Sequence, residues 1–349
     1  MLAEISFHNA HPEAGPGDSL LLPRYPEVIR QSLSENGALM AADSCGVEIR
    51  FVTDARNIDV TLSNAAGETR LEVFCGAFYH SSHRLPSATP ATLSLEAPPF
   101  LQDFSDADFL SSGYDKNVWR IVLGRGQHYF HAVDTKGASL RAPGRPEVPR
   151  TRWLAYGSAT THAGLHGYPL HGARLLHWEV LNKALTDACL LEPQAIDYLA
   201  QITSHLNIDV VTAELGLDML AACSVKEFQK RVELFVSTMR EQHSEVPLIL
   251  ITSFPSCWHR KETRASDKQL KFDQVLREMI DPKKDPLLCL VEGGDLMTDF
   301  TLLGCDLLQP SPSGQAEIGY RLACCLGEMM NDRMGAEKAP QKASNLAPA

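Results

Sequence analysis

The stretch WLAYGSATTHAG, residues 153–164, contains the side chains with the clearest chemical potential. An apolar run leads into Gly157, and hydroxyl groups follow at Ser158 and Thr160. A strand that ends in a hydroxyl-rich loop is typical of hydrolases, which attack their substrates through a side chain held at the strand end. The central position of this loop is Ala159, which has no atom that can attack. The stretch therefore predicts a site whose nucleophile is missing.

The residues before this stretch predict a domain of antiparallel strands. From about residue 45 to 140, apolar residues recur at every second position; Val47, Ile49 and Phe51, for example, alternate with Glu48 and Arg50. Such alternation, interrupted by Gly, Pro and Asn clusters, indicates short strands packed as a sandwich.

The residues after a proline-rich, basic segment at 141–152 follow a different pattern. Helical segments alternate with strand-like runs, and in one of the helices Phe228, Val232, Phe235 and Met239 share a face. This alternation predicts a mostly parallel sheet covered by helices on both sides, with functional groups at the carboxyl ends of its strands. The runs are RWLAYGS, EVLNKAL, DVVTAEL, PLILITSF and LLCLVEG.

These patterns divide the chain into four parts. We expect a β-sandwich domain over residues 1–145, a linker over 146–152, an α/β domain over 153–333 and a disordered tail over 334–349.

Composition narrows the classes of partner. The chain has 349 residues with 44% hydrophobic and 21% charged residues, as in a globular protein, and its net charge of -11 disfavours nucleic acid and anionic membranes as partners. It contains no apolar run of about 20 residues. Nine cysteines without zinc-type spacing indicate reduced thiols and a cytoplasmic protein. We expect a small-molecule substrate or ligand and neither metal nor cofactor, and the sequence leaves the oligomeric state open.

Five blocks of the sequence, taken in order, resemble the SGNH (GDSL-type) hydrolases that carry an N-terminal β-sandwich. The resemblance covers about residues 20–330 and implies a flavodoxin-like α/β domain after a jelly-roll-like sandwich. It implies a Ser nucleophile, a His base, an orienting Asp, and an oxyanion hole built from Ser and Gly N–H groups and an Asn amide. A literal GDSL at 17–20 lacks the strand–turn–helix context and is interpreted as a coincidence. The blocks are VWRIVLGRG, RWLAYGSATTHAG, LNKALTDACLLEP, VVTAELGLDM and DLLQPSPSGQAEIGYRLA.

Carried onto this chain, the resemblance places altered residues at four catalytic positions. Ala159 stands where the nucleophile is expected, Asp187 where the oxyanion glycine is expected, and Asp218 in place of the amide-bearing Asn. Gln309 replaces the general base, while Asp306 persists. An amide has no useful basicity, and an ionised Asp218 would repel an oxyanion, so we expect ordinary acyl transfer to be abolished.

The same mapping brings carboxylates together. Asp187, Asp218 and Asp306 are expected to converge beside Ala159, with Glu214 slightly deeper on the same strand as Asp218. Carboxyl groups that share a partly dry pocket cannot all ionise, so at least one pKa should rise, and the result is a general acid/base pair. The alternative is that catalysis has been lost and the acids instead form ion pairs with Arg or Lys, or hydrogen bonds with backbone N–H groups. A divalent cation held by the three Asp residues is a further alternative, which no DxD-type spacing supports.

Neighbouring polar residues are candidates for substrate binding, and each has a structural alternative. The hydroxyls can instead cap or satisfy the loop, and the aromatic ring can serve packing. One of the two histidines at the pocket mouth, or the tyrosine, could donate a proton. The candidates are Ser158, Thr160, His162, His166 and Tyr168.

Three hypotheses follow. The first is an SGNH fold repurposed as a non-hydrolytic acid/base enzyme (an isomerase, cyclase or dehydratase) for a small organic substrate, for example in specialised metabolism. The second is a catalytically dead pseudoenzyme that binds a small ligand, an acyl or glycosyl group, or a partner protein. The third is an esterase with an unorthodox nucleophile.

Overall fold

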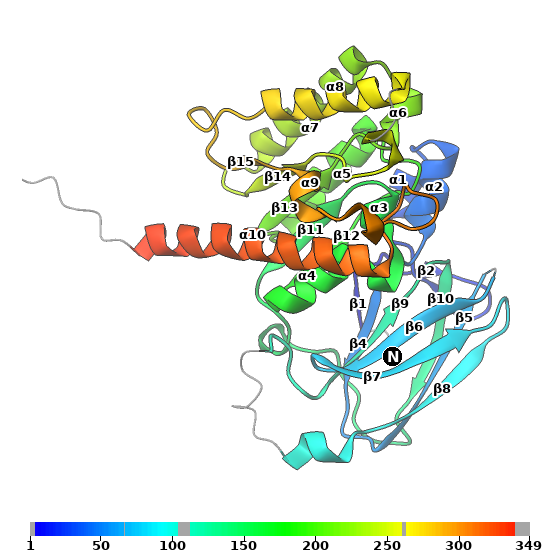
Figure 1. Ribbon diagram of the computed structural model, residues 1–349. Coiled ribbons are helices and arrows are strands. Elements are labelled where there is room, and N and C mark those ends of the chain that lie inside the picture. The colour runs from blue at the N-terminus through cyan, green and yellow to red at the C-terminus, as the bar shows by residue number, and fades with distance from the viewer. Residues whose placement is uncertain (1–3, 66, 104–111, 260–262, 339–349) are drawn as a thin grey trace, which may run out of the picture.

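The computed structural model describes residues 4–65, 67–103, 112–259 and 263–338. The chain forms an antiparallel β-sandwich followed by an α/β domain, as the sequence predicts (Figure 1). Among the described residues, no helix is long and apolar enough to cross a membrane. All nine cysteines are free thiols.

Two five-stranded sheets make up the sandwich, with orders β1-β4-β9-β6-β7 and β2-β3-β10-β5-β8. Val47, Ile49 and Phe51 point into the core between the sheets, as their alternation predicts. The strands are β1 (Ser6–His8), β2 (Glu13–Ala14), β3 (Leu20–Leu21), β4 (Glu48–Val52), β5 (Asn57–Asn64), β6 (Thr69–Cys75), β7 (Phe78–Leu85), β8 (Ala91–Glu96), β9 (Val118–Leu123) and β10 (His128–Asp134).

The outer face of β4 departs from the usual pattern of a half-solvated strand, because Glu48 and Arg50 are buried as well. They face the α/β domain, where Arg50 pairs with Glu179. Both faces of this strand are therefore covered, one by the sandwich core and the other by the domain interface.

The N-terminal segment adds elements that alternation alone does not predict. Strands β1 to β3 complete the two sheets, and the GDSL residues 17–20 lie at the turn between β2 and β3, outside the α/β domain. Two helices follow, α1 (Glu27–Arg30) and α2 (Glu35–Ala42). Ser34 caps α2, and its backbone N–H donates to Glu192 of the α/β domain over 2.9 Å.

All five predicted strand runs form the parallel sheet of the α/β domain, in the order β12-β11-β13-β14-β15. A short 3-10 helix, η4 (Arg145–Glu147), precedes the first strand within the proline-rich segment. The strands are β11 (Arg152–Tyr156), β12 (Glu179–Asn182), β13 (Val210–Glu214), β14 (Leu248–Ile251) and β15 (Leu288–Val291).

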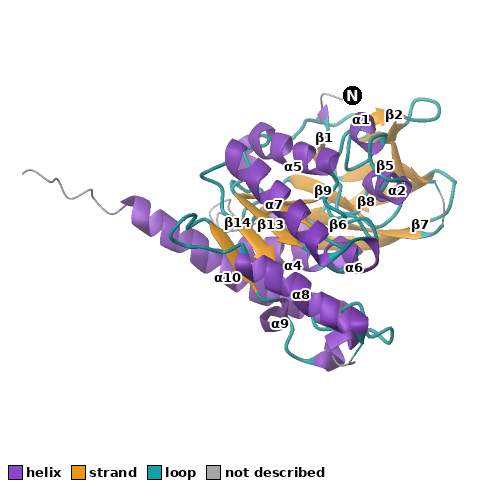
Figure 2. Ribbon diagram, turned by 90° about the horizontal axis from the view of Figure 1, so that it is seen from above, coloured by secondary structure: helices purple, strands orange, loops and turns teal. Residues whose placement is uncertain are grey.

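Helices cover both faces of this sheet (Figure 2). α4 (Tyr168–Leu176) and α10 (Pro312–Lys338) pack together on one face. α5 (Pro193–His205), α7 (Val225–Gln242) and α8 (Arg264–Glu278) cover the other.

The predicted apolar face of α7 is confirmed, because all four of its residues are buried. Residues 334–338, which we expected in a disordered tail, continue helix α10, and 339–349 lie outside the described residues. The shorter helices are α3 (Ala159–His162), α6 (Met219–Ala222), α9 (Gly293–Leu296), η2 (Pro99–Asp103), η5 (Gly164–His166), η6 (Cys257–His259) and η7 (Phe300–Leu302).

Candidate functional site

The loop that follows β11 begins the candidate site. Ser158 is the N-cap of α3, and its hydroxyl accepts a hydrogen bond from Thr160 N over 3.3 Å, as a capping residue does. The same hydroxyl donates to Glu214 over 2.6 Å, and the side chain is buried. Ala159 is the first residue of the helix and is partly exposed. Ser158 therefore fixes the loop from beneath, while Ala159 reaches the surface.

Glu214, the last residue of β13, is the buried acid under this loop. Its Oε2 atom accepts from the Ser158 N–H over 2.8 Å, from the Ser158 hydroxyl, and from the Thr161 hydroxyl over 3.1 Å. Burial raises the pKa of Glu214, and these hydrogen bonds oppose the rise. A side chain at Gly157 would place its Cβ 2.8 Å from Oε2, so the backbone can approach the carboxyl group only through a glycine.

Asp218 lies four residues further on, at the N-cap of α6, and is partly exposed. Burial raises the pKa of its carboxyl group to about 7, although the Cys189 N–H donates to Oδ2 over 3.1 Å and opposes the rise. The negative charges of Glu214 and Asp187 raise the pKa further. Among the residues that the structure describes, no cation lies within 4 Å of this carboxylate. Asp218 is therefore partly protonated at neutral pH.

Asp187 supplies the second acid of a pair. It is exposed, in the loop that follows β12, and its charge acts on Asp218. Its φ of 53° lies in the left-handed region, which glycine favours and Asp tolerates. Asn36 of α2 donates to its carbonyl oxygen over 3.1 Å. The position where the resemblance implies a glycine thus keeps a backbone conformation that suits glycine, while its side chain adds a carboxylate.

Gln309 and Asp306 occupy the turn before α10, and their contacts differ. Gln309 reaches the α3 loop, where its Oε1 accepts from the Thr160 hydroxyl over 3.0 Å. Asp306 is exposed, and its Oδ1 accepts from the N–H groups of Leu308 (2.9 Å) and Gln309 (3.1 Å) in its own turn. Of the three predicted Asp residues, Asp187 and Asp218 interact, whereas the hydrogen bonds of Asp306 stabilise its turn.

Of the two histidines that were candidates for the pocket mouth, His162 lies below the surface. It is fully buried, its Nδ1 donates to the Thr186 hydroxyl over 2.8 Å, and its Nε2 accepts from Arg24 over 2.7 Å. Burial and the charge of Arg24 lower its pKa to about 3. The imidazole is therefore neutral at physiological pH and links the sandwich segment to the site loops.

Tyr168 and His166 differ in their exposure to solvent. Tyr168 is buried, its hydroxyl lies 2.9 Å from the Thr161 hydroxyl, and burial raises its pKa. His166, in η5, is exposed. Tyr168 thus supports the α3 loop from below, and only His166 of the two has solvent access.

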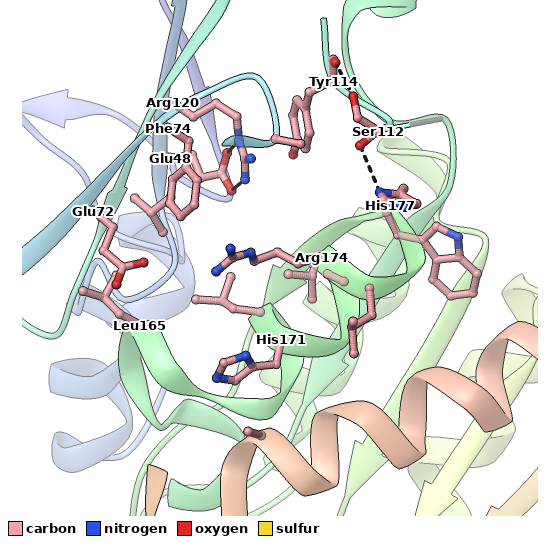
Figure 3. A pocket seen from close by; sticks show the side chains of 18 residues that line it. Glu48, Glu72, Phe74, Ser112, Tyr114, Arg120, Leu165, His171, Arg174 and His177 are labelled. Atoms are coloured by element: carbon pink, nitrogen blue, oxygen red, sulfur yellow. Dashed lines mark hydrogen bonds and ion pairs between the residues drawn. The ribbon is translucent and has the colours of Figure 1, made fainter. Parts of the chain in front are cut away.

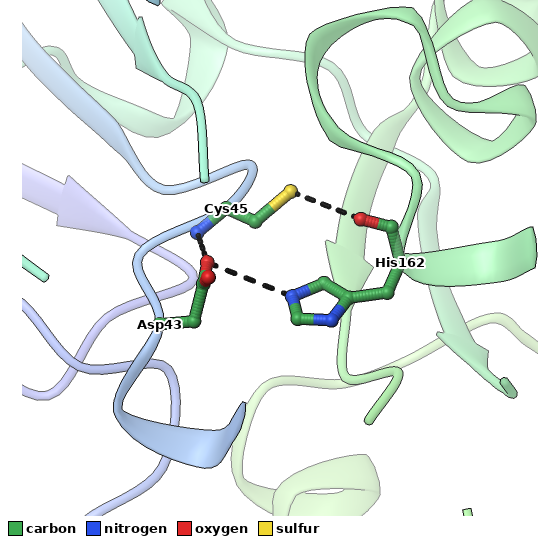
Figure 4. A group of neighbouring side chains, drawn as sticks. All are labelled: Asp43, Cys45 and His162. Atoms are coloured by element: carbon green, nitrogen blue, oxygen red, sulfur yellow. Dashed lines mark hydrogen bonds and ion pairs between the residues drawn. The ribbon is translucent and has the colours of Figure 1, made fainter. Parts of the chain in front are cut away.

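One group of possible metal ligands occurs among the described residues: Asp43, Cys45 and His162 (Figure 4). Their atoms already have partners. Arg24 donates to His162 Nε2, Cys45 Sγ donates to the His162 carbonyl over 3.3 Å, and Arg125 pairs with Asp43 over 3.0 Å. We interpret the group as a hydrogen-bonded cluster behind the site, because two guanidinium groups already supply its positive charge.

Arg24 is the residue that sequence analysis missed. It is fully buried and donates to the carbonyl oxygens of Asn182 (2.9 Å), Ala184 (2.8 Å), Asp43 and Met40. It thereby ties the N-terminal segment to the loop after β12. The only signal in the sequence is a single cation in the apolar, proline-containing run LLPRYP.

The arrangement of the two domains resembles that of known structures. Two antiparallel sheets followed by a five-stranded parallel sheet with helices form an architecture similar to that of family two carbohydrate esterases. No family model matches the sequence, and no curated protein matches it.

Three solved structures illustrate the similarity. A salicylyl-acyltransferase from a tetracycline biosynthetic pathway has a TM-score of 0.73 at 15% identity, over 93% of this chain and 95% of its own. A putative GDSL-like lipase from Bacteroides ovatus has a TM-score of 0.67 at 13% identity, over 94% and 98%. A family two carbohydrate esterase from Cellvibrio japonicus has a TM-score of 0.59 at 12% identity, over 94% and 96%. At these identities the likeness establishes the fold alone.

Proposed function

We propose that this chain is a non-hydrolytic acid/base enzyme that acts on a small organic substrate. The proposal rests on the pair Asp187 and Asp218, which lie in the loops at the carboxyl ends of β12 and β13. Among the described residues, no cation is bound to either acid. Asp218 is partly protonated near neutral pH, and the nearby carboxylate of Asp187 favours that protonation. One group can then donate a proton while the other accepts one.

This proposal departs from the chemistry that the names of the similar structures describe. Those names are an acyltransferase, a putative lipase and carbohydrate esterases. Acyl transfer through a serine needs a hydroxyl and a base, and this chain has Ala159 and Gln309 at the positions that the resemblance assigns to them. Isomerisation, dehydration and cyclisation can proceed by general acid/base catalysis without a nucleophile on the enzyme, so a carboxyl pair can supply the groups that they need.

Proton exchange in deuterium oxide tests the proposal, because it detects proton transfer whatever product is formed. A panel of small ketones and β-hydroxy acids is incubated with the protein, and loss of the signal from the carbon next to the carbonyl is followed by proton NMR. We expect exchange with at least one compound and a loss of about 100-fold or more in Asp218→Asn. Asp306→Asn is the matched control, because its amide oxygen can still accept the turn hydrogen bonds, and its exchange should remain.

Two outcomes would contradict the proposal. Labelling of the unmodified protein by a fluorophosphonate probe, together with cleavage of p-nitrophenyl acetate, would indicate an esterase with an unorthodox nucleophile. Exchange that is the same in Asp218→Asn as in the unmodified protein would remove the acid/base pair from the reaction.

A binding-only role is the second candidate, and one observation favours it. Gln309 is held by Thr160, and Asp306 by the backbone of its own turn. Both residues are thus used in structural hydrogen bonds, as expected where catalysis has been lost and polar groups have found new partners. Compounds that bind the unmodified protein and Asp218→Asn with shifted affinity but show no exchange would establish this role.

A further inference from the structure

A cavity of about 550 Å³ lies between the sandwich and helix α4, apart from the loops described above (Figure 3). None of the residues assigned to the candidate site line it. Its volume falls in the range of small-molecule sites, and a junction between domains is a common place for such a site. Most of its wall is apolar and comes from both domains, including Phe74, Val122, Leu165, Leu170 and Val180.

One cation in this cavity has no hydrogen-bond acceptor among the described residues. Arg174, in the last turn of α4, is exposed to solvent and points into the cavity between Phe74 and His171 (Figure 3). Its guanidinium lies 5.0 Å from the centre of the Phe74 ring, and this stacking orients it. Within the described part of the chain, it makes no hydrogen bond and no ion pair within 4 Å. Partial burial lowers the pKa of Arg174, although the charge of Glu72 opposes this.

The second arginine of the cavity is different. Arg120 donates to both carboxylate oxygens of Glu48, over 2.7 and 2.8 Å, and stacks on Tyr114 at 3.8 Å. Its charge is neutralised within the structure, so it has little capacity left for a ligand. Arg174 is therefore the cation that a ligand would meet.

The histidines of the cavity add polar groups. Burial lowers the pKa of His171, as does the charge of Arg174, so the ring is neutral at physiological pH. His177 donates from Nδ1 to the Ser112 carbonyl over 3.1 Å, which leaves Nε2 as a hydrogen-bond acceptor when the ring is neutral. The cavity thus combines an apolar wall, a few polar atoms and one guanidinium that has no hydrogen-bond acceptor among the described residues, with Glu72 as the opposing charge.

We propose that this cavity binds a small organic anion with an apolar body, whose carboxylate group forms a two-point hydrogen bond with Arg174. A carboxylate matches the planar guanidinium in geometry as well as charge, and the apolar body fills the space lined by Phe74 and the aliphatic side chains. Glu72 lies on the cavity wall and disfavours the anion, so it limits the affinity. This site is independent of the acid/base pair.

Binding of three carboxylates to the full chain tests the proposal: 3-phenylpropionate, 4-tert-butylbenzoate and octanoate, each beside its neutral amide. Saturation-transfer NMR detects binding, and calorimetry measures the Kd. We expect at least one carboxylate to bind and its amide to bind about tenfold more weakly or not at all. Arg174→Ala should weaken the carboxylate by about tenfold or more, and Arg174→Lys by less, because an ammonium cannot form the two-point contact.

Three further variants determine where the ligand binds. Glu72→Gln removes the opposing charge and should tighten binding of the carboxylate. Arg56→Ala removes an exposed arginine that pairs with Glu96 on the other sheet of the sandwich, and Asp218→Asn alters the candidate active site, so both should leave the Kd unchanged. The proposal is wrong if none of the carboxylates binds at millimolar concentration, if the amides bind equally well, or if Glu72→Gln weakens binding, as it would for a cationic ligand.

Discussion

Two groups of buried carboxylates in this protein have opposite electrostatic surroundings. At the domain interface, Glu48 accepts from Arg120 and Arg50, and Glu179 pairs with Arg50 and Arg152. Although burial opposes ionisation, these guanidinium groups hold the pKa of Glu48 well below its usual range and lower that of Glu179 to about 2. Both acids are ionised and paired.

At the carboxyl ends of the parallel strands the described structure provides no such cation. Glu214 accepts only from hydroxyl and backbone groups, and Asp218 from a backbone N–H, and burial raises the pKa of both. The difference separates two uses of a buried acid. An acid that faces arginine holds the domains together, whereas an acid without a cation keeps a proton that it can exchange.

The largest expected effect comes from removing one charge of the interface group. Glu48→Gln preserves the shape of the side chain but leaves Arg120 and Arg50 buried without their shared carboxylate. We expect a loss of about 3–5 kcal/mol in the free energy of unfolding, measured by urea denaturation at pH 7. The protein has two domains, so the transition should be followed by more than one spectroscopic probe.

Glu227→Gln is the control for this change. Glu227 is partly exposed and pairs with Arg231 one helical turn away on α7, so solvent screens the pair and Glu227→Gln should destabilise the protein much less than Glu48→Gln. If Glu48→Gln lowered the free energy of unfolding as little as Glu227→Gln does, the interface carboxylates would not stabilise the fold. The two groups of acids would then not differ in the way described above.

Asp218→Asn is expected to have an intermediate effect on stability, and above pH 7 it should stabilise the protein, whereas Glu48→Gln should destabilise it. The folded-state pKa of about 7 lies above the ordinary value near 3.8, so the folded protein retains a proton that the unfolded chain releases between these values. The stability of the unmodified protein should therefore fall as the pH rises from about 4 to 7, and the variant should not share this fall.

The amide keeps an oxygen for the Cys189 N–H, so the two proteins should be equally stable near pH 4. Above pH 7, Asp218→Asn should be more stable by about 2–4 kcal/mol, from roughly 1.4 kcal/mol for each pKa unit. Denaturation at pH 4, 6 and 8 measures this, and a difference that does not change with pH would contradict the raised pKa.

The elements of the fold follow from periodicity, because that signal is local. The alternation of Val47, Ile49 and Phe51 gives strand β4, and the spacing of Phe228 and Val232 gives the buried face of α7. A strand with this alternation usually turns its polar side chains to solvent, but Glu48 is buried. Periodicity assigns residues to faces, but it contains no information on which face a second domain covers.

The site is predictable only in part, for the same reason. The strand-end positions of Ala159, Asp187 and Asp218 follow from the order of strands and loops. The burial of His162 depends on Arg24, which is 138 residues away in the sequence and belongs to the other domain. The sequence around either residue contains no sign of this contact, so the sequence alone could not show that His162 is buried.

The smallest effect is expected for Glu214→Gln. This variant can be compared directly with Glu48→Gln because the chemical change is the same. If Glu214 carries a proton in the folded state, the amide resembles the acid in shape and charge, and its oxygen can still accept from Ser158. The cost at pH 5 should be below about 1 kcal/mol, by urea denaturation. A cost at pH 5 as large as that of Glu48→Gln would mean that Glu214 is ionised and strongly stabilised. In that case burial without a cation would not distinguish the two groups of acids.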